Sequence, residues 1–212
     1  MSEIKGLIVD FGGVLTTSVF DSFRAFCIEN ELDIEILKAV LRGAFESSEP
    51  EAENWVHKME TGQITADEFN KLLAEGLSAG REKPIDAEGL KDRLFANCKA
   101  EPEMFDLLRE ARGAGVKTAL LSNSWGGDGY PRDSFEELFD AVVISGEEGF
   151  RKPQPEIYRL AAERLDLTPE ECVFVDDFEV NTKGAEAVGM QTIHHTSVDK
   201  TVGQVKKLIS RS

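Results

Sequence analysis

Cysteine is scarce in this chain, with three residues among 212, and the three lie far apart in the sequence. Cys27, Cys98 and Cys172 form no CxxC pair and no cysteine–histidine group at metal-ligand spacing, which argues against a disulfide framework and a zinc site. A chain of this length can bury a sufficient core as one domain, or as one domain with an insertion, without such cross-links. The cysteine content therefore fits a reducing cytoplasm.

Long apolar runs are also missing. No stretch of 18 residues is apolar enough to cross a bilayer, and the N-terminus has no basic segment followed by an apolar core. We therefore expect neither a signal peptide nor a membrane span.

Basic residues are few: 24 lysines and arginines stand against 40 aspartates and glutamates, a formal charge of −16. Such a charge repels nucleic-acid phosphates and anionic lipids, so we expect neither nucleic acid nor a membrane as a main partner. The phosphate-binding loops GxxxxGK[ST] and GxGxxG after a strand are absent as well. No pattern specifies an oligomeric state.

What the sequence does contain is a series of short apolar runs that alternate with helical spacing. The first run, Leu7 to Val9, lies within GLIVDFGGVLT, and four others cover residues 116–123, 141–145, 172–177 and 190–195. The alternation predicts an α/β fold, a Rossmann-like, doubly wound parallel sheet. We expect the intervening helices over residues 103–112, 133–138, 155–165, 181–188 and 198–209.

Residues 20 to about 80 show helical spacing and no convincing strand. Thr65 and Glu68 have the spacing of a capping box, which predicts a helix start, and Gly76, Gly80 and Pro84 are expected to end that helix. The apolar positions with helical spacing are Phe23, Phe26, Cys27, Ile34, Leu37, Val40, Leu41, Phe69, Leu72 and Leu73.

This helical block separates the first strand from the others, so it is best read as an insertion over the carboxyl edge of the sheet. The predicted organisation is an α/β core over residues 1–15 and 86–212, with an α-helical cap over residues 16–85.

Polar side chains follow three of the predicted strands: Asp10 the first, Ser122 and Asn123 the second, and Asp176 and Asp177 a later one. Parallel strands bring these ends together, where open α/β folds bind ligands. Clustered carboxylates repel one another unless a hard divalent cation with oxygen ligands lies between them. Mg²⁺ is the natural choice, although Asp10 alone could simply terminate its strand.

Lys152 lies in FRKPQPEIY, just before a proline and a predicted helix. A fixed cation there would neutralise a bound phosphoryl group and keep a nucleophilic carboxylate ionised. The alternative is an ordinary solvated lysine, but the flanking Arg151 and two prolines favour a constrained loop.

Four motifs occur in order along nearly the whole chain: DFGGVLT, LLSNS, RKPQPEIY and VFVDDFEVN. In this order they resemble the motifs of the haloacid dehalogenase (HAD) superfamily of phosphohydrolases, in particular members with an α-helical cap inserted after the first motif. The cap segment METGQITADEF is similar to the helix start in the phosphatase domain of soluble epoxide hydrolase and in bacterial sugar-phosphate phosphatases. The resemblance implies a HAD-like core and Mg²⁺-dependent hydrolysis of a small phosphorylated metabolite.

Carried to this sequence, the resemblance makes Asp10 the nucleophile that accepts the phosphoryl group. Mg²⁺ would be bound by Asp10, the backbone carbonyl of Gly12, and Asp177, with Asp176 acting through water or through Lys152.

The resemblance also implies a phosphate site. Ser122 and Asn123 would hold the phosphoryl oxygens, and Lys152, which joins Asp10 as a catalytic residue, would offset their charge. The turn of Gly12 and Gly13 would let backbone amides approach the phosphate closely.

The sequence departs from the family pattern at Gly12. The pattern is DxDxT or DxDxV, whose second aspartate donates a proton to the leaving oxygen and later activates water, assistance worth about 10²–10⁴-fold. Three outcomes stay open: a phosphatase helped by water, a cap residue or a good leaving group; a dehalogenase or other C–X hydrolase; and a non-catalytic phosphoester-binding or regulatory protein. The aspartate pair and Lys152 favour the phosphatase, since a dehalogenase needs no magnesium, and the missing acid disfavours a phosphomutase.

Other residues have both a functional and a structural interpretation. Trp125, in the glycine-rich WGGDGYP, borders a substrate or belongs to a simple turn, and His57 is a substitute acid or a packed helix residue. We expect Trp55 to pack on a helix face. Asn181 either caps the helix that follows the aspartate pair or also positions that pair, and the capping role alone is the favoured interpretation.

Overall fold

A computed structural model describes residues 3–42, 54–126 and 129–210. Its centre is a five-stranded sheet in the order β3-β2-β1-β4-β5, and every strand pair is parallel. This confirms the predicted doubly wound α/β fold. The strands are β1 (Gly6–Val9), β2 (Lys117–Ser122), β3 (Ala141–Ile144), β4 (Cys172–Asp176) and β5 (Gln191–His194).

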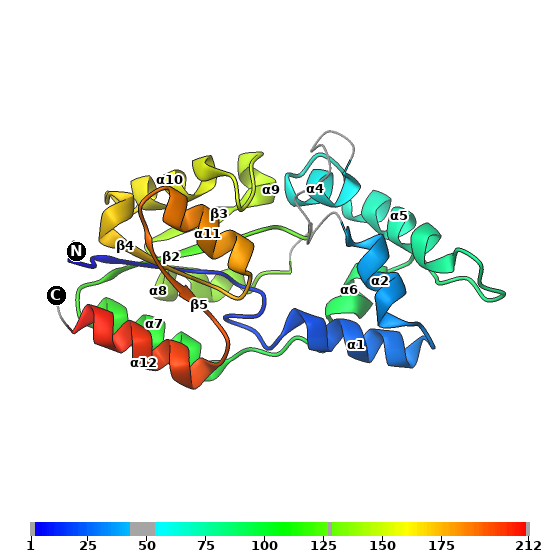
Figure 1. Ribbon diagram of the computed structural model, residues 1–212, viewed down its shortest axis with the longest axis horizontal. Helices are drawn as coiled ribbons and strands as arrows, with labels where there is room; N and C mark the ends of the chain where they lie inside the picture. Colours follow the sequence, from blue (N-terminus) through cyan, green and yellow to red (C-terminus); the bar gives the residue numbers. More distant parts are fainter. Residues whose placement is uncertain (1–2, 43–53, 127–128, 211–212) are drawn as a thin grey trace.

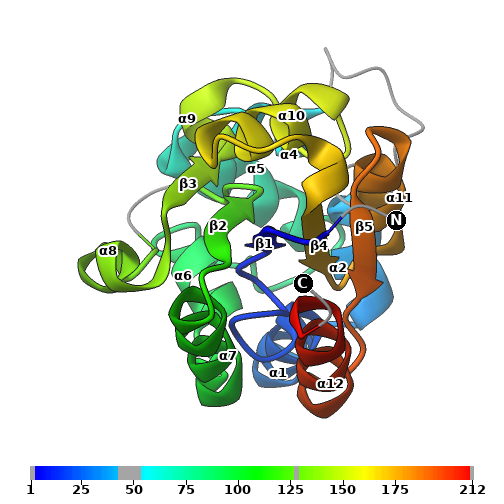
Figure 2. The ribbon, with the colours of Figure 1, turned by 90° about the vertical axis from the view of Figure 1, so that its left-hand side faces the viewer.

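Helices cover both faces of the sheet (Figure 2). Helices α7 (Pro102–Gly113) and α12 (Val198–Ile209) pack on one face, and α10 (Pro155–Arg164) and α11 (Glu179–Ala187) on the other. Within β1, Leu7 and Val9 join the apolar cluster of the first face, whereas Ile8 joins that of the second. A strand buried on both sides needs apolar residues at every position, which explains the uninterrupted run in the sequence.

Short elements complete this part of the fold. The predicted helix over residues 133–138 is a 3-10 turn, Arg132–Ser134, followed by α8 (Phe135–Leu138). Two further pieces, α9 (Ser145–Glu148) and the 3-10 turn Pro169–Glu171, lie outside the sequence prediction. Each spans a single turn, too short to show a hydrophobic period.

The described part of the inserted segment is helical and lies beside the carboxyl edge of the sheet (Figure 1). The capping box at the start of α5 is present, with Thr65 and Glu68 each accepting a backbone hydrogen bond from the other. The helix continues through Gly76 to Ser78, beyond the first predicted breaker. The helices are α1 (Val19–Glu29), α2 (Ile34–Val40), α4 (Trp55–Glu60), α5 (Ala66–Ser78) and α6 (Leu90–Phe95).

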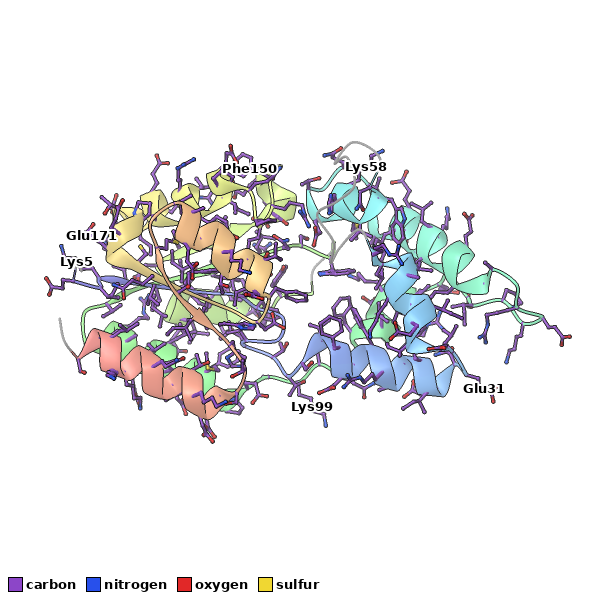
Figure 3. The ribbon with its side chains drawn as sticks, viewed as in Figure 1. Lys5, Glu31, Lys58, Lys99, Phe150 and Glu171 are labelled. Atoms are coloured by element: carbon purple, nitrogen blue, oxygen red, sulfur yellow. The ribbon has the colours of Figure 1, made fainter. Side chains whose placement is uncertain are left out.

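Helix α6 lies beyond the predicted cap range of residues 16–85 but packs with helices of that range. Leu90 and Leu94 of α6 are buried in the apolar cluster of α1 and α5, not in those of the sheet. The two linkers to the sheet then run side by side: the Thr17 amide donates to the Lys99 carbonyl at 2.7 Å, and a β-bridge joins Thr16 to Ala100. Figure 3 shows Lys99 at this connection. We therefore propose that the cap extends through α6, past residue 85.

None of the described helices of the cap lies at the other end of the sheet (Figure 1). Lys5 and Glu171, labelled in Figure 3, form an exposed ion pair of 2.7 Å there, at the amino ends of β1 and β4. None of the described helices is long and apolar enough to cross a membrane.

One of the apolar residues that the helical spacing of α5 predicted to be buried is partly exposed. Leu73 is fully buried, whereas its neighbour Leu72 is 38% exposed. We predict that Leu73→Ala lowers the free energy of unfolding by about 2–5 kcal/mol, since it leaves a cavity in the cap core. The matched variant Leu72→Ala should cost well under half as much. Urea unfolding of the two variants measures the difference, and equal losses would show that the register of α5 is wrong.

Candidate active site

The carboxyl ends of β1, β2 and β4 meet at the edge of the sheet that faces the helical unit. Val9 pairs with Val175 of β4 and with Leu120 of β2, so the polar residues that follow emerge at the same level. The backbone amide of Asp10 continues the pairing by donating to the Val175 carbonyl at 2.9 Å. The register therefore places Asp10 next to Asp176.

Lys152 lies between these two carboxylates. Its Nζ is 2.8 Å from Oδ1 of Asp10 and 2.6 Å from Oδ2 of Asp176, and all three side chains are buried. Burial alone would lower the pKa of Lys152, but Asp10 and Asp176 raise it above its ordinary value, so the ammonium stays charged. The solvated-surface interpretation of Lys152 is wrong.

A third carboxylate, Asp177, completes an acidic cluster. One oxygen from each of Asp10, Asp176 and Asp177 lies within 4.8 Å of the others. Oδ1 of Asp177 is buried without a hydrogen-bond partner. With all groups ionised, three carboxylates and the Lys152 ammonium leave a charge of −2 at this cluster. The oxygen donors, the unsatisfied oxygen and the residual charge together fit one hard divalent cation.

The same cluster shifts the acidities of its members. Burial raises the pKa of Asp10 to about 6, with Lys152 opposing the shift and Asp176 adding to it. Burial, together with the charges of Asp10 and Asp176, raises the pKa of Asp177 to about 8. Burial is the largest cause of both shifts, and a cation bound at this cluster would lower both pKa values.

Gly13 makes room for this cluster. Its φ is +79°, and a Cβ at this position would lie 2.3 Å from Oδ2 of Asp177. Only glycine combines that backbone conformation with that closeness. The structure thus places Gly13 against Asp177, and the phosphate-binding role of its amide remains a hypothesis.

Asp176 is held in place from its far side. The backbone amide of Phe178 donates to its Oδ1 at 2.8 Å, and Asn181 Nδ2 lies 3.0 and 3.1 Å from its two oxygens. Asn181 therefore orients Asp176, in agreement with the interpretation that it positions the aspartate pair. The prediction that it caps α11 is wrong: Phe178 is the N-cap, and Asn181 lies inside the helix.

The end of β2 lies beside the cluster, with Ser122 as its last residue and Asn123 directly after it. The Asn123 side chain bridges to the lysine loop, accepting from the Lys152 amide at 2.8 Å and donating to its carbonyl at 3.1 Å. Ser122 Oγ accepts a hydrogen bond of 3.0 Å from the hydroxyl of Tyr130, whose burial raises its pKa to about 12. Asn123 thus fixes the loop that carries Lys152.

A small cavity of about 80 Å³ opens beside these groups. Of the predicted site residues, Asp10, Gly12, Ser122, Asn123 and Lys152 line it, whereas Gly13, Asp176 and Asp177 do not. Trp125 lines it too, which supports the substrate-bordering interpretation of that residue. His57 is buried in α4 and is not among the lining residues, and Trp55 packs on Phe69 with ring centroids 5.3 Å apart, as expected.

Sequence reasoning missed a buried ion pair at this cavity. Glu60, the last residue of α4, pairs with Arg151, and both side chains are less than a tenth exposed. Asn123 Nδ2 lies 3.4 Å from the same carboxylate, and burial raises the pKa of Glu60 although Arg151 opposes the shift. The two residues are 91 positions apart, so no local pattern in the sequence links them.

The pair belongs to the junction between the cap and the sheet. Close by, Ser145 of α9 donates to the backbone carbonyl of Glu60, and a Cβ on Gly62 would lie 2.4 Å from the Gly146 carbonyl oxygen. Figure 3 shows Lys58 of α4 and Phe150, which precedes Arg151, on the two sides of this junction. The cap therefore contributes a carboxylate to the same loop that carries Lys152.

Comparison with known proteins identifies the class to which this fold and site belong. The haloacid dehalogenase-like hydrolase family matches residues 4–189. The chain belongs to this family, which confirms the resemblance seen in the four motifs.

Two curated proteins are similar to this chain over most of its length. Over 205 residues the chain is 28% identical to mouse bifunctional epoxide hydrolase 2, and the match covers 89% of this chain and 36% of the relative's length. It is 27% identical to the sesquiterpene phosphatase astK of Aspergillus oryzae, over 98% of both chains. The chain thus spans about a third of the first protein and nearly all of the second.

A solved structure shows the same fold. A HAD family enzyme from Bacteroides thetaiotaomicron, in complex with magnesium and inorganic phosphate, superimposes with a TM-score of 0.61 at 24% identity, over 90% of this chain and 93% of the other.

The Glu60–Arg151 pair makes a direct prediction about stability. Glu60→Gln should lower the free energy of unfolding by about 3–5 kcal/mol, because it leaves a buried guanidinium without its counter-ion. The control is Glu137→Gln, which breaks an ion pair of 2.9 Å with Arg109 whose side chains are 66% and 48% exposed. That change should cost about 0–1 kcal/mol. Urea denaturation measures both, and a small loss for Glu60→Gln would mean that the pair is not buried in solution.

Proposed function

We propose that this chain is a Mg²⁺-dependent phosphatase that hydrolyses small phosphate monoesters through an aspartyl-phosphate intermediate on Asp10. The observation that carries the proposal is the convergence of Asp10, Lys152 and the Asp176–Asp177 pair at the cavity end of the sheet. The phosphatase relative that matches over nearly its whole length supports the same reaction class.

Asp10, the backbone carbonyl of Gly12, and Asp177 would hold the cation. When bound, Mg²⁺ supplies positive charge that offsets the phosphoryl oxygens and keeps the carboxylates ionised. Asp176, whose oxygens are taken by Lys152, Asn181 and the Phe178 amide, would act mainly by fixing Lys152. The magnesium and phosphate bound to the structural neighbour support this assignment.

In the first half-reaction, a carboxylate oxygen of Asp10 attacks phosphorus and the bond from phosphorus to the ester oxygen breaks. Lys152 keeps Asp10 ionised as the nucleophile and offsets the charge on the transferring phosphoryl group. Ser122 and Asn123, which line the cavity, would hold its oxygens by hydrogen bonds.

In the second half-reaction, water attacks phosphorus, the bond from phosphorus to Asp10 breaks, and inorganic phosphate leaves. Gly12 offers no side chain to protonate the leaving oxygen in the first step or to take a proton from water in the second. The leaving oxygen therefore takes its proton from solvent, and good leaving groups react fastest.

The nucleophile and the metal are tested together. Turnover of p-nitrophenyl phosphate should require Mg²⁺, stop with EDTA, and fall at least about 10³-fold in Asp10→Asn, because the amide is a poor nucleophile. Asp106→Asn, which changes an aspartate whose side chain is 68% exposed and does not line the cavity, is the control and should leave the rate unchanged. Turnover that persists in EDTA or in Asp10→Asn would overturn the proposal, and chloride release from chloroacetate would support the dehalogenase alternative.

Restoring an acid at position 12 tests the role of its absence. Hydrolysis rates should fall steeply as the leaving group becomes more basic, and Gly12→Asp should flatten that dependence by raising alkyl-ester rates about 10²-fold or more. The backbone accepts the change, since φ at Gly12 is outside the left-handed region, but the added Cβ would lie 3.1 Å from Cγ2 of Val19, so that side chain must move by a few tenths of an ångström.

The matched control is Gly12→Asn, which has the same shape without a titratable proton. The hydrolysis rates of aryl and alkyl phosphates are measured for the unaltered protein, Gly12→Asp and Gly12→Asn. Equal rates for both ester types in the unaltered protein would show that another group supplies the proton.

A further inference from the structure

We infer that the substrate carries a long apolar leaving group, which binds in a second, larger cavity that meets the phosphate site at Gly12. The inference rests on the proposed phosphatase function and names the substrate class of that same site.

The second cavity is large and mainly apolar. Its volume is about 380 Å³, within the range of small-molecule binding sites. It lies between α7 of the core and α6 of the cap, and residues of both parts line it. Its apolar walls come from Phe11, Val19, Phe95, Phe105, Trp125 and Tyr130.

This cavity adjoins the phosphate site. Gly12, Val19, Ser122, Asn123 and Trp125 line both cavities. A side chain at position 12 would project toward Val19, with its Cβ 3.1 Å from that side chain. An ester group on the phosphoryl group would therefore enter the apolar space beside the residues that line both cavities, and a side chain at position 12 would take up room there.

The polar groups on the wall already have partners. Lys91 Nζ donates to the Gly126 carbonyl at 2.7 Å and lies 3.3 Å from Asp92. Thr16 Oγ1 accepts from the Gly13 amide at 3.1 Å and donates to the carbonyl of the next residue at 3.1 Å. The Tyr130 hydroxyl donates to Ser122.

This pairing favours a hydrocarbon over a sugar. A sugar leaving group would bring several hydroxyls into a space with few unpaired partners, and each hydroxyl that loses water without a new hydrogen bond weakens binding. An alkyl, prenyl or aryl group loses no hydrogen bond there and removes apolar surface from water.

The volume sets the size of the group. A cavity of about 150 Å³ is enough to bind benzene, so a space of about 380 Å³ accommodates roughly a dozen carbons.

Straight-chain alkylphosphonates test the inference without relying on turnover. Their phosphonate group occupies the phosphate site, their C–P bond is not hydrolysed by this mechanism, and lengthening the chain barely changes their acidity. Titration calorimetry with Mg²⁺ should show binding that tightens on the order of two- to fourfold for each added methylene from ethyl to decyl, all below micelle-forming concentrations.

A matched pair of variants locates the alkyl chain. Phe105, half-buried on α7, lines the cavity, whereas Phe150, also half-buried, packs on the opposite face of the sheet. Phe105→Gln should weaken decylphosphonate binding about tenfold more than ethylphosphonate binding, and Phe150→Gln should change neither. Thermal unfolding checks that both variants are folded, and the chain-length series on the unaltered protein decides the question if Phe105→Gln does not fold.

Affinity that is independent of chain length, or an equal loss in both variants, would overturn the inference. The two proposals fail in different ways: absence of p-nitrophenyl phosphate turnover contradicts the phosphatase, whereas flat chain-length dependence in an active enzyme contradicts only the apolar substrate class.

Discussion

One buried ammonium group organises this protein's site. Lys152 Nζ contacts both Asp10 and Asp176, at 2.8 and 2.6 Å, in a place where its own side chain is 1% exposed. A lysine in that position is costly to bury unless carboxylates surround it, and the carboxylates repel each other unless a cation lies between them. The burial of Lys152 therefore depends on the two carboxylates, and their closeness depends on Lys152. With Asp177 ionised, the three carboxylates exceed the single charge of Lys152 by two, and this excess is what a divalent cation would balance.

The sheet and the helical unit both position the residues around Lys152. Parallel pairing of β1 with β2 and β4 brings Asp10, Ser122 and Asp176 to one edge, although they are more than 50 residues apart in the chain. The helical unit closes over that edge, and its Glu60 pairs with Arg151, the neighbour of Lys152. Gly12 lies where the phosphate site meets the apolar cavity. In the proposed reaction, the side chain missing at this position is the one that would supply an acid.

Local patterns were sufficient to predict the sheet and the residues at its edge. A strand buried on both faces has an unmistakable apolar run, and the polar residue that follows it has a fixed place once the strands are parallel. Features that depend on tertiary contacts could not be predicted from local patterns. The Glu60–Arg151 pair joins residues 91 positions apart and leaves no periodic signal. Asparagine is a common helix-capping residue, but Asn181 donates a hydrogen bond to Asp176 from inside α11. Helix α6 lies beyond residue 85, and only its contacts with α1 and α5 show that it packs with the cap.

The central claim is that Asp10 carries the phosphoryl group during turnover. Borohydride reduces an acyl phosphate on aspartate to homoserine, and peptide mass spectrometry then reports the modified position. Because Gly12 also leaves the second step without a base, the intermediate should persist long enough to be trapped. The account predicts homoserine at position 10 only when a phosphate ester and Mg²⁺ are both present. Modification at another residue, or unmodified Asp10 in an enzyme that is releasing phosphate, would contradict it.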